Sequence, residues 1–381
     1  MEISVNIRKW ARKTYMYLCY LTRPRKEKTV FFASFRGQYS DNPRAISECL
    51  HKIAPDVKIV WLIKPQFQQY VPEYVVTVPP EPRLALRAQA RAKVWVLNYT
   101  YRKHLGVYKG LDNFYIQTWH GDRGLKTIGY LTGFSKEKDY SGNDLSECDL
   151  FVAGSDYGVK KARQGLLYEG EFIVEGMPRN DKLINISDHI DEATKIKKSL
   201  SLDSNVKVML YAPTFRENSD QQQCAIDIAS SIAALESNGE QWVCLVRSHS
   251  LSKGISVGGD CPAFLDVTSY PDMADLLLIA DLLITDYSSC AGDFLLTGKP
   301  VVLVHFDRHD YESQGRPLWV DPKKAGYLVA KNQDELNQIL SNLSSYDHKA
   351  TADNINRFYG TKETGLSSEA VSKRILEVVN N

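Results

Sequence analysis

The chain has 381 residues, of which 43% are apolar and 24% charged, the composition of a globular protein with enough apolar residues for two cores. Its formal net charge of +1 excludes the strongly basic balance of a general nucleic-acid binder, so we expect no nucleic-acid partner. Seven cysteines without a CxxC pair predict reduced, mostly buried thiols rather than a disulfide framework.

Residues 1–28 form a basic amphipathic segment. They carry eight Lys and Arg residues against two Glu, interleaved with Trp10 and several tyrosine and aliphatic residues. The longest uncharged run, residues 14–22, is too short for a membrane span of about 20 apolar residues and has no signal-peptide cleavage site. Such a segment is typical of helices that lie in an anionic membrane interface. The alternative is a helix whose apolar face packs on its own domain.

Downstream, short apolar runs alternate with helical patterns, and many of these runs are continuous rather than alternating. Continuous runs are expected of strands that helices cover on both faces, so the pattern predicts an α/β chain with parallel sheets. The predicted strands are residues 29–34, 58–63, 94–97, 113–118, 149–153, 172–174, 207–212, 241–247, 263–266, 281–285 and 300–304.

The turn-rich region 176–204 separates two predicted Rossmann-like domains. We place an N-terminal domain at residues 29–190 and a C-terminal domain at residues 191–381. The last amphipathic stretch, residues 364–379, is expected to pack back on the first domain. Two doubly wound domains that face an interdomain cleft form the GT-B-like architecture, in which ligands bind at the carboxyl ends of the strands.

The first candidate site follows the predicted strand 113–118 and has the sequence Trp119-His120-Gly121-Asp122-Arg123-Gly124-Leu125-Lys126. Imidazole titrates near neutrality, so His120 is a candidate to take a proton from an attacking hydroxyl. Gly121 allows the backbone to approach a ligand, and Arg123 and Lys126 supply positive charge for phosphate. A structural role for a histidine at a strand end is equally common.

Two more polar segments follow predicted strands. In Gly176-Met177-Pro178-Arg179-Asn180-Asp181, the side chains of Arg179 and Asp181 either contact a ligand or pair with each other. In Ala212-Pro213-Thr214-Phe215-Arg216, the proline ends the strand, so that Thr214 and Arg216 point toward the expected cleft. Arg216 is a candidate for bidentate phosphate binding.

His249 follows the predicted strand 241–247 and is a second histidine at a strand end, in the other predicted domain. Together with His120 it would complete an acid–base site. One imidazole would take the proton of the acceptor hydroxyl, and the other would stabilise or protonate the phosphate and leaving group.

The predicted strand 281–285 leads into Thr285 and Asp286, and Ser288 and Ser289 then open a helix. The N–H groups and the positive dipole end of a helix start bind anions, so this is a candidate diphosphate site; the alternative is a plain helix cap. The His- and Asp-rich loop 305–311 has neither an HxxxH helix nor a cysteine partner, and we predict no metal site.

Taken together, these segments resemble the CDP-glycerol glycerophosphotransferase family of wall teichoic acid synthesis. The family's blocks are WHG…LK, GxPRxD, APT[WF]R, a basic-x-His strand end, TDYSS, and Asp-Phe with Lys-Pro. They occur in this order at residues 119–126, 176–181, 212–216, 247–249, 285–289 and 293–300. The ordered set is more specific than any single block. Departures from the family pattern at residues 122–124 and 312–320 leave the acceptor and polyol preference open.

The resemblance implies a GT-B fold, CDP-glycerol as the donor substrate, CMP as the product, and no cofactor. It implies acid–base roles for His120 and His249. Donor-phosphate contacts are implied for Arg216, Thr285, Ser288 and Ser289, with Thr214 and Asp286 in the same predicted site. A peripheral protein at the cytoplasmic face of the cell membrane, with a lipid-linked saccharide as acceptor, is also implied; a homo-oligomer is left open.

Among family members, the chain resembles the primases in length, so we expect a primase that adds glycerol phosphate to an undecaprenyl-diphosphate-linked disaccharide. Three alternatives stay open. They are a compact poly(glycerol or ribitol phosphate) transferase, a GT-B glycosyltransferase with a nucleotide-sugar donor, and a catalytically silent, membrane-associated polyanion binder.

Overall fold

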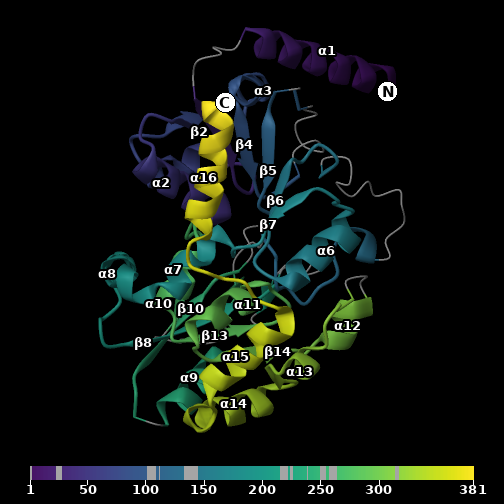
Figure 1. Cartoon of the computed structure of the whole chain (residues 1–381). Coiled ribbons are helices and arrows are strands. Elements are labelled where there is room, and N and C mark those ends of the chain that lie inside the picture. The colour runs from purple at the N-terminus through teal and green to yellow at the C-terminus, as the bar shows by residue number, and fades with distance from the viewer. Residues whose placement is uncertain are drawn as a thin grey trace. The chain divides into compact units, whose positions relative to one another are not determined.

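A computed structural model of the chain describes residues 2–22, 28–100, 109–110, 112–132, 145–214, 222–223, 226–237, 239–248, 255–256, 264–313 and 317–381. The chain forms two compact units (Figure 1). Unit 1 comprises residues 1–122, 128–181 and 362–381, and unit 2 comprises residues 123–127 and 182–361. The chain thus leaves unit 1 after Asp181, before the predicted boundary between residues 190 and 191, and returns to it at Lys362.

Unit 1 is built on a seven-stranded sheet in which every strand pair is parallel. The strand order is β3-β2-β1-β4-β5-β6-β7, so the chain reverses its direction of winding between β1 and β4. The strands are β1 (Thr29–Ala33), β2 (Lys58–Leu62), β3 (Val76–Val78), β4 (Val94–Leu97), β5 (Phe114–Gln117), β6 (Leu150–Val152) and β7 (Glu171–Ile173).

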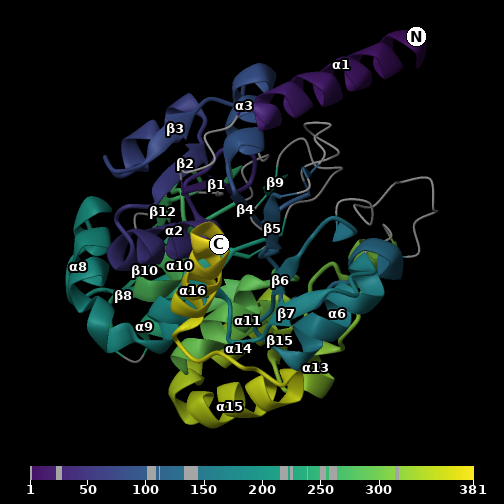
Figure 2. The same cartoon turned by 45° about the horizontal axis from the view of Figure 1, so that its top comes forward.

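Helices cover both faces of this sheet. They are α1 (Glu2–Leu21), α2 (Asp41–Ile53), α3 (Pro82–Arg91), α6 (Asp156–Leu166) and α16 (Ser367–Asn380). Val30 and Phe32 of β1 pack in one core with α2 and α16, whereas Phe31 and Ala33 pack in a second core with α1 and α3. This alternation follows from the two-residue period of a strand. Helix α16 lies alongside α2 in both views (Figures 1 and 2), which makes the end of the chain part of the core of unit 1.

Helix α1 has two different faces. Met16 and Cys19 are buried in the core that α3 shares, and α1 packs against α3. Trp10, Leu18 and Leu21 are more than half exposed, at 69%, 55% and 58%. Among the residues that the structure describes, no helix is both long and apolar enough to cross a bilayer.

Unit 2 repeats the same topology. Its parallel six-stranded sheet has the order β12-β10-β8-β13-β14-β15, so winding reverses between β8 and β13. The strands are β8 (Lys207–Ala212), β10 (Trp242–Val246), β12 (Phe264–Asp266), β13 (Leu282–Thr285), β14 (Val301–Val304) and β15 (Leu328–Ala330). Two further strands, β9 (Gln222–Gln223) and β11 (Ile255–Ser256), pair with each other.

The helices of unit 2 follow the strands. They are α8 (Ile190–Ser199), α9 (Ile228–Glu236), α10 (Met273–Ile279), α11 (Cys290–Phe294), α12 (Arg308–Ser313), α13 (Pro322–Ala325), α14 (Gln333–Ser341) and α15 (His348–Tyr359). The short helix α7 (Asp181–Ile184) lies at the junction of the two units. Helices α9 and α14 bury Ile232, Leu336 and Leu340 against β8, β10 and β13.

The prediction of an α/β chain with two parallel sheets is confirmed, and each predicted strand is present within two residues of its predicted ends. The prediction omitted β3, β15 and the two-residue strands β9 and β11. Each has at most three residues, and Thr77 interrupts the apolar residues of β3, so none produces a long apolar run.

Candidate active site

His120 lies directly after β5 in unit 1, and its ring is held on several sides. Its Nδ1 lies 2.7 Å from the backbone oxygen of Asn98, which follows β4. The ring stacks on Trp119 with centroids 4.8 Å apart and meets the edge of Phe35, which follows β1, at 5.4 Å. The carboxyl ends of β1, β4 and β5 therefore converge on one imidazole, at the point where the winding of the sheet reverses.

The hydrogen bond to Asn98 determines the tautomer of His120. A carbonyl oxygen accepts but cannot donate, so Nδ1 must carry the proton. In the neutral ring, Nε2 is then the nitrogen with the lone pair. This is the tautomer that a general base acting through Nε2 requires.

The backbone before His120 is strained and clamped. Trp119 has φ +50°, a left-handed conformation that costs a non-glycine residue on the order of 1–2 kcal/mol. Its N–H donates to the side chain of Gln117 at 2.8 Å, and its carbonyl accepts from the side chain of Asn42 at 3.1 Å. These bonds hold a conformation that the sequence alone would not favour.

Asn98, whose carbonyl contacts His120, belongs to a network of polar groups that connects the ends of β1 and β4 with the start of α2. The side chain of Asn98 donates to Asp41 Oδ2 at 3.2 Å and accepts from the backbone N–H of Phe35 at 3.1 Å. Asp41 Oδ1 pairs with Arg179 Nη1 at 3.0 Å, and both side chains are less than a tenth exposed. Asp41 has φ +64°, so the start of α2 is strained as well. The network supports Asn98 and, through its carbonyl, the ring of His120.

Asn98 and Asp41 were missed in the sequence. Asn98 follows a predicted strand directly, so the rule that singled out His120 also applied to it. For Arg179 and Asp181, the sequence left ligand contact and mutual pairing as alternatives, and the structure shows other partners for both. Arg179 pairs with Asp41, and Asp181 accepts the backbone N–H groups of Ser367 and Ser368 at 3.0 and 2.7 Å, which caps α16.

The motif around His120 divides between the two units. Asp122 is buried in unit 1 and accepts from the Gly154 N–H at 3.0 Å and the Ser155 hydroxyl at 2.6 Å, which ties the loop after Gly121 to the start of α6. Arg123 is buried in unit 2, where Nη2 lies 3.4 Å from Asp293 Oδ1. Lys126 bridges to Leu318 through its backbone. The described contacts of Arg123 are to other protein side chains, Asp293 and Asn356. Its contact with a phosphate stays a prediction.

In unit 2, Thr214, Thr285 and Asp286 lie at the second reversal point, where β8 and β13 end. Asp286 Oδ1 accepts from the N–H and hydroxyl of Thr214 at 2.9 and 2.6 Å, and so joins the ends of these two strands. The Thr285 hydroxyl donates to the carbonyl of Ala212 at 2.6 Å and is fully buried. Thr214, Thr285 and Asp286 therefore brace the sheet edge.

Ser288 and Ser289 are half-buried and directly precede α11. Ser288 Oγ accepts from the backbone N–H of Cys290 at 3.4 Å, whereas the side chain of Ser289 makes no capping hydrogen bond to α11. Burial raises the pKa of Cys290 to about 11, so the thiol stays protonated at neutral pH and is no nucleophile.

His305 supports the same loop from β14. Its Nε2 lies 3.1 Å from the carbonyl oxygen of Asp286, and its ring packs on Tyr287, whose hydroxyl donates to Asp307 at 3.0 Å. Burial lowers the pKa of His305, which favours the neutral ring. Two predicted residues, Arg216 and His249, lie outside the described residues.

We predict that Asp41 and Arg179 are energetically coupled. Removing one partner of a buried ion pair leaves the other charge uncompensated, so Asp41→Asn and Arg179→Gln should each lower the free energy of unfolding by roughly 3 kcal/mol. The double variant should lose clearly less than the sum. Urea unfolding of the four proteins gives the coupling energy. The exposed pair Lys373–Glu369 is the control, with an expected coupling below about 1 kcal/mol. Additive losses at Asp41 and Arg179, within about 0.5 kcal/mol, would contradict the network.

Comparison with known proteins identifies the family. Residues 15–380 match the family described as CDP-Glycerol:Poly(glycerophosphate) glycerophosphotransferase. The chain is 30% identical over 388 residues to the teichoic acid poly(glycerol phosphate) polymerase of Bacillus subtilis, which covers 96% of the chain but only 51% of that protein. It is also 30% identical over 391 residues to the teichoic acid glycerol-phosphate transferase of Staphylococcus aureus, covering 94% of each.

Among solved structures, the wall teichoic acid polymerase TagF has a TM-score of 0.84 at 26% identity, covering 99% of this chain and 96% of that chain. The likeness bears out the predicted GT-B-like fold class. The match of the family over nearly the whole chain, together with this likeness, shows that the chain belongs to the CDP-glycerol:poly(glycerophosphate) glycerophosphotransferase family.

Proposed function

We propose that the protein transfers glycerol phosphate from CDP-glycerol to a hydroxyl of a lipid-linked acceptor and releases CMP. Family membership supports this donor and this class of reaction. The observation that carries the proposal is the hydrogen bond from His120 to the carbonyl of Asn98, because it leaves Nε2 as the proton acceptor.

In the proposed reaction, His120 Nε2 takes the proton of the acceptor hydroxyl as that oxygen attacks the phosphorus that bears the glycerol. The new bond joins the acceptor oxygen to phosphorus, and the bond from phosphorus to the CMP oxygen breaks. Phosphoryl transfer relies mainly on positioning and on compensation of the developing charge. We assign that compensation to His249, Arg216 and the helix start at Ser288 and Ser289.

We further propose that the protein extends a chain rather than primes one. The primase expectation was based on length alone. Two relatives that match almost the whole chain are named a poly(glycerol phosphate) polymerase and a glycerol-phosphate transferase. An extending enzyme accepts an acceptor that already carries glycerol phosphate, whereas a primase adds one unit to a bare disaccharide.

We also propose that the protein works as a peripheral protein at the cytoplasmic face of the membrane, where a lipid-linked acceptor would be presented. Helix α1 supports this proposal. Its exposed residues Trp10, Tyr17, Leu18 and Leu21 follow helical spacing and lie on one face, away from the buried Met16 and Cys19. An apolar stripe on a basic segment suits an anionic lipid surface.

The first test is CMP release from CDP-glycerol with a soluble analogue of the lipid-linked acceptor. Loss of a general base typically costs 10²–10⁴-fold, so we expect His120→Ala to lower kcat by at least about a hundredfold. His249→Ala should show a similar loss. His51→Ala is the matched control, because His51 stacks on Tyr74 outside the site and should retain activity. Mass spectrometry should find several glycerol phosphate units on each acceptor.

Three outcomes would count against these proposals. Full activity of His120→Ala would contradict the assignment of His120 as the general base. A single unit on every acceptor would restore the primase alternative. No CMP release with any acceptor would overturn the donor assignment and favour a nucleotide-sugar donor.

The second test concerns α1 and lipid vesicles. We expect the wild type to co-sediment with vesicles that contain phosphatidylglycerol but not with pure phosphatidylcholine. Because each buried leucine contributes roughly 1.5–3 kcal/mol, Trp10→Ser/Leu18→Ser/Leu21→Ser should bind at least about tenfold more weakly. The control is Leu167→Ser/Ile190→Ser/Phe358→Ser, which removes equally exposed apolar side chains elsewhere. Equal binding by both variants would show that α1 does not carry the contact.

A further inference from the structure

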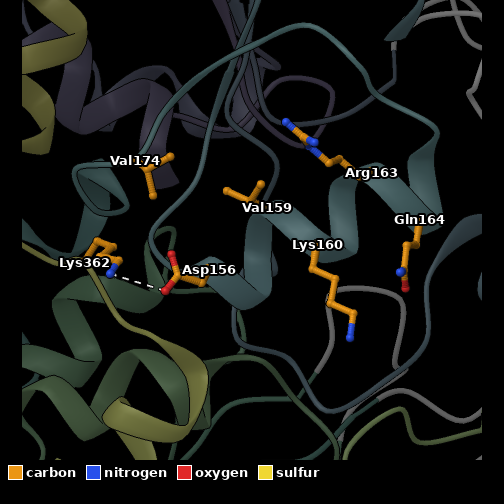
Figure 3. Close-up of a pocket in the computed structure, with 7 residues that line it drawn as sticks. All are labelled: Asp156, Val159, Lys160, Arg163, Gln164, Val174 and Lys362. Atoms are coloured by element: carbon orange, nitrogen blue, oxygen red, sulfur yellow. Dashed lines mark ion pairs between the residues drawn. The ribbon is translucent and has the colours of Figure 1, made fainter.

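A basic pocket lies in unit 1, outside the site described above (Figure 3). Its volume is about 540 Å³. Lys160 and Arg163 reach it from α6, and Lys362 reaches it from the segment that leads into α16. The pocket also contains one carboxylate, that of Asp156. With three positive side chains and one negative, the lining carries a net charge of +2, which favours an anionic ligand.

The local structure fixes the wall of the pocket. Lys160 and Arg163 are three residues apart on α6 and so lie on one face of the helix. The guanidinium of Arg163 lies over the ring of Phe172, 5.7 Å from its centroid, a cation–π contact that orients it. The backbone N–H of Lys362 donates to the carbonyl of Gly154 at 2.8 Å, and its ammonium pairs with Asp156 at 3.3 Å.

The cations do not point to a single centre. In Figure 3, Arg163, Lys160 and the Lys362–Asp156 pair lie on different sides of Val159, and Val174 lies on the side of Lys362. A single phosphate is best bound by donors that converge on it. Separated cations around half-buried valines instead suit a linear ligand with several negative groups joined by short carbon spacers.

We propose that this pocket binds the polyol phosphate chain of the acceptor. This inference rests on the proposed function, because only an extending enzyme meets an acceptor with several phosphodiesters. Within unit 1, the start of α6 connects the pocket to the loop of His120. Asp122, two residues after His120, accepts from the hydroxyl of Ser155, and Asp156 is the next residue. Phosphodiesters held in the pocket increase the affinity for long acceptors over short ones.

The test measures binding of labelled oligo(glycerol phosphate) of increasing length by fluorescence anisotropy, without donor. The pocket variant is Lys160→Gln/Arg163→Gln/Lys362→Gln. The control variant, Lys52→Gln/Arg83→Gln/Lys373→Gln, removes the same charge from exposed positions of unit 1 that do not line the pocket. Both should keep the melting temperature of the wild type, because the side chains changed are exposed.

For the wild type and the control, affinity should increase with oligomer length. Three exposed charge contacts together change a binding affinity about tenfold, so the pocket variant should bind the longest oligomer about tenfold more weakly. Its affinity should also lose most of its dependence on oligomer length. In the CMP-release assay, the KM for long acceptors should increase to a similar extent, with the KM for CDP-glycerol unchanged.

Equal binding of the longest oligomer by the pocket variant and the control would overturn the inference. It would also fail if affinity were independent of length and inorganic phosphate competed as well as the oligomer, because the site would then hold a single anion. The two proposals fail separately. Absence of CMP release with length-dependent binding intact refutes the transferase, whereas CMP release without a pocket effect refutes the pocket.

Discussion

The hydrogen bond between His120 Nδ1 and the carbonyl of Asn98 is the interaction on which the candidate active site depends. It fixes the proton on Nδ1, so that Nε2 carries the lone pair of the neutral ring. Its geometry requires the registered ends of β4 and β5, which pair in parallel from Val94↔Phe114 to Leu97↔Gln117. It also requires the left-handed Trp119, which the side chains of Gln117 and Asn42 hold in place. Sheet register and backbone strain therefore both determine the tautomer of this ring, and the proposed acid–base role depends on that tautomer.

The two units share one sheet topology and one arrangement of candidate residues. Each sheet reverses its winding between its first and fourth strand in chain order, and each places its candidate residues after the strands beside that reversal. In unit 1, Asn98 after β4 donates to Asp41 at the start of α2, and in unit 2, Thr214 after β8 donates to Asp286 after β13. Such braces are strong only when their partners are all present, because an unpaired buried charge is costly.

The sequence predicted the sheets well because buried parallel strands are continuous apolar runs. It also indicated His120 as a candidate site residue, because polar residues at the carboxyl ends of neighbouring parallel strands converge. It failed where a role depends on contacts between distant residues. Asp41 and Arg179 are 138 positions apart, and no local pattern connects them. Likewise, Arg123 and Thr285 have the residue types of phosphate ligands, yet both are buried against protein partners. The residue type at a strand end predicts where a site lies. Burial then decides which of its polar side chains bond to the protein itself rather than to a ligand.

The tautomer of His120 is the most direct test of this account. Two-bond ¹H–¹⁵N spectra at neutral pH report which imidazole nitrogen carries the proton, and the signal that disappears in His120→Gln identifies this residue among the eight histidines. We predict that neutral His120 carries its proton on Nδ1 and that Nε2 has the shift of an unprotonated nitrogen. A proton on Nε2 would contradict the hydrogen bond to Asn98 and, with it, the assignment of His120 as a general base through that nitrogen.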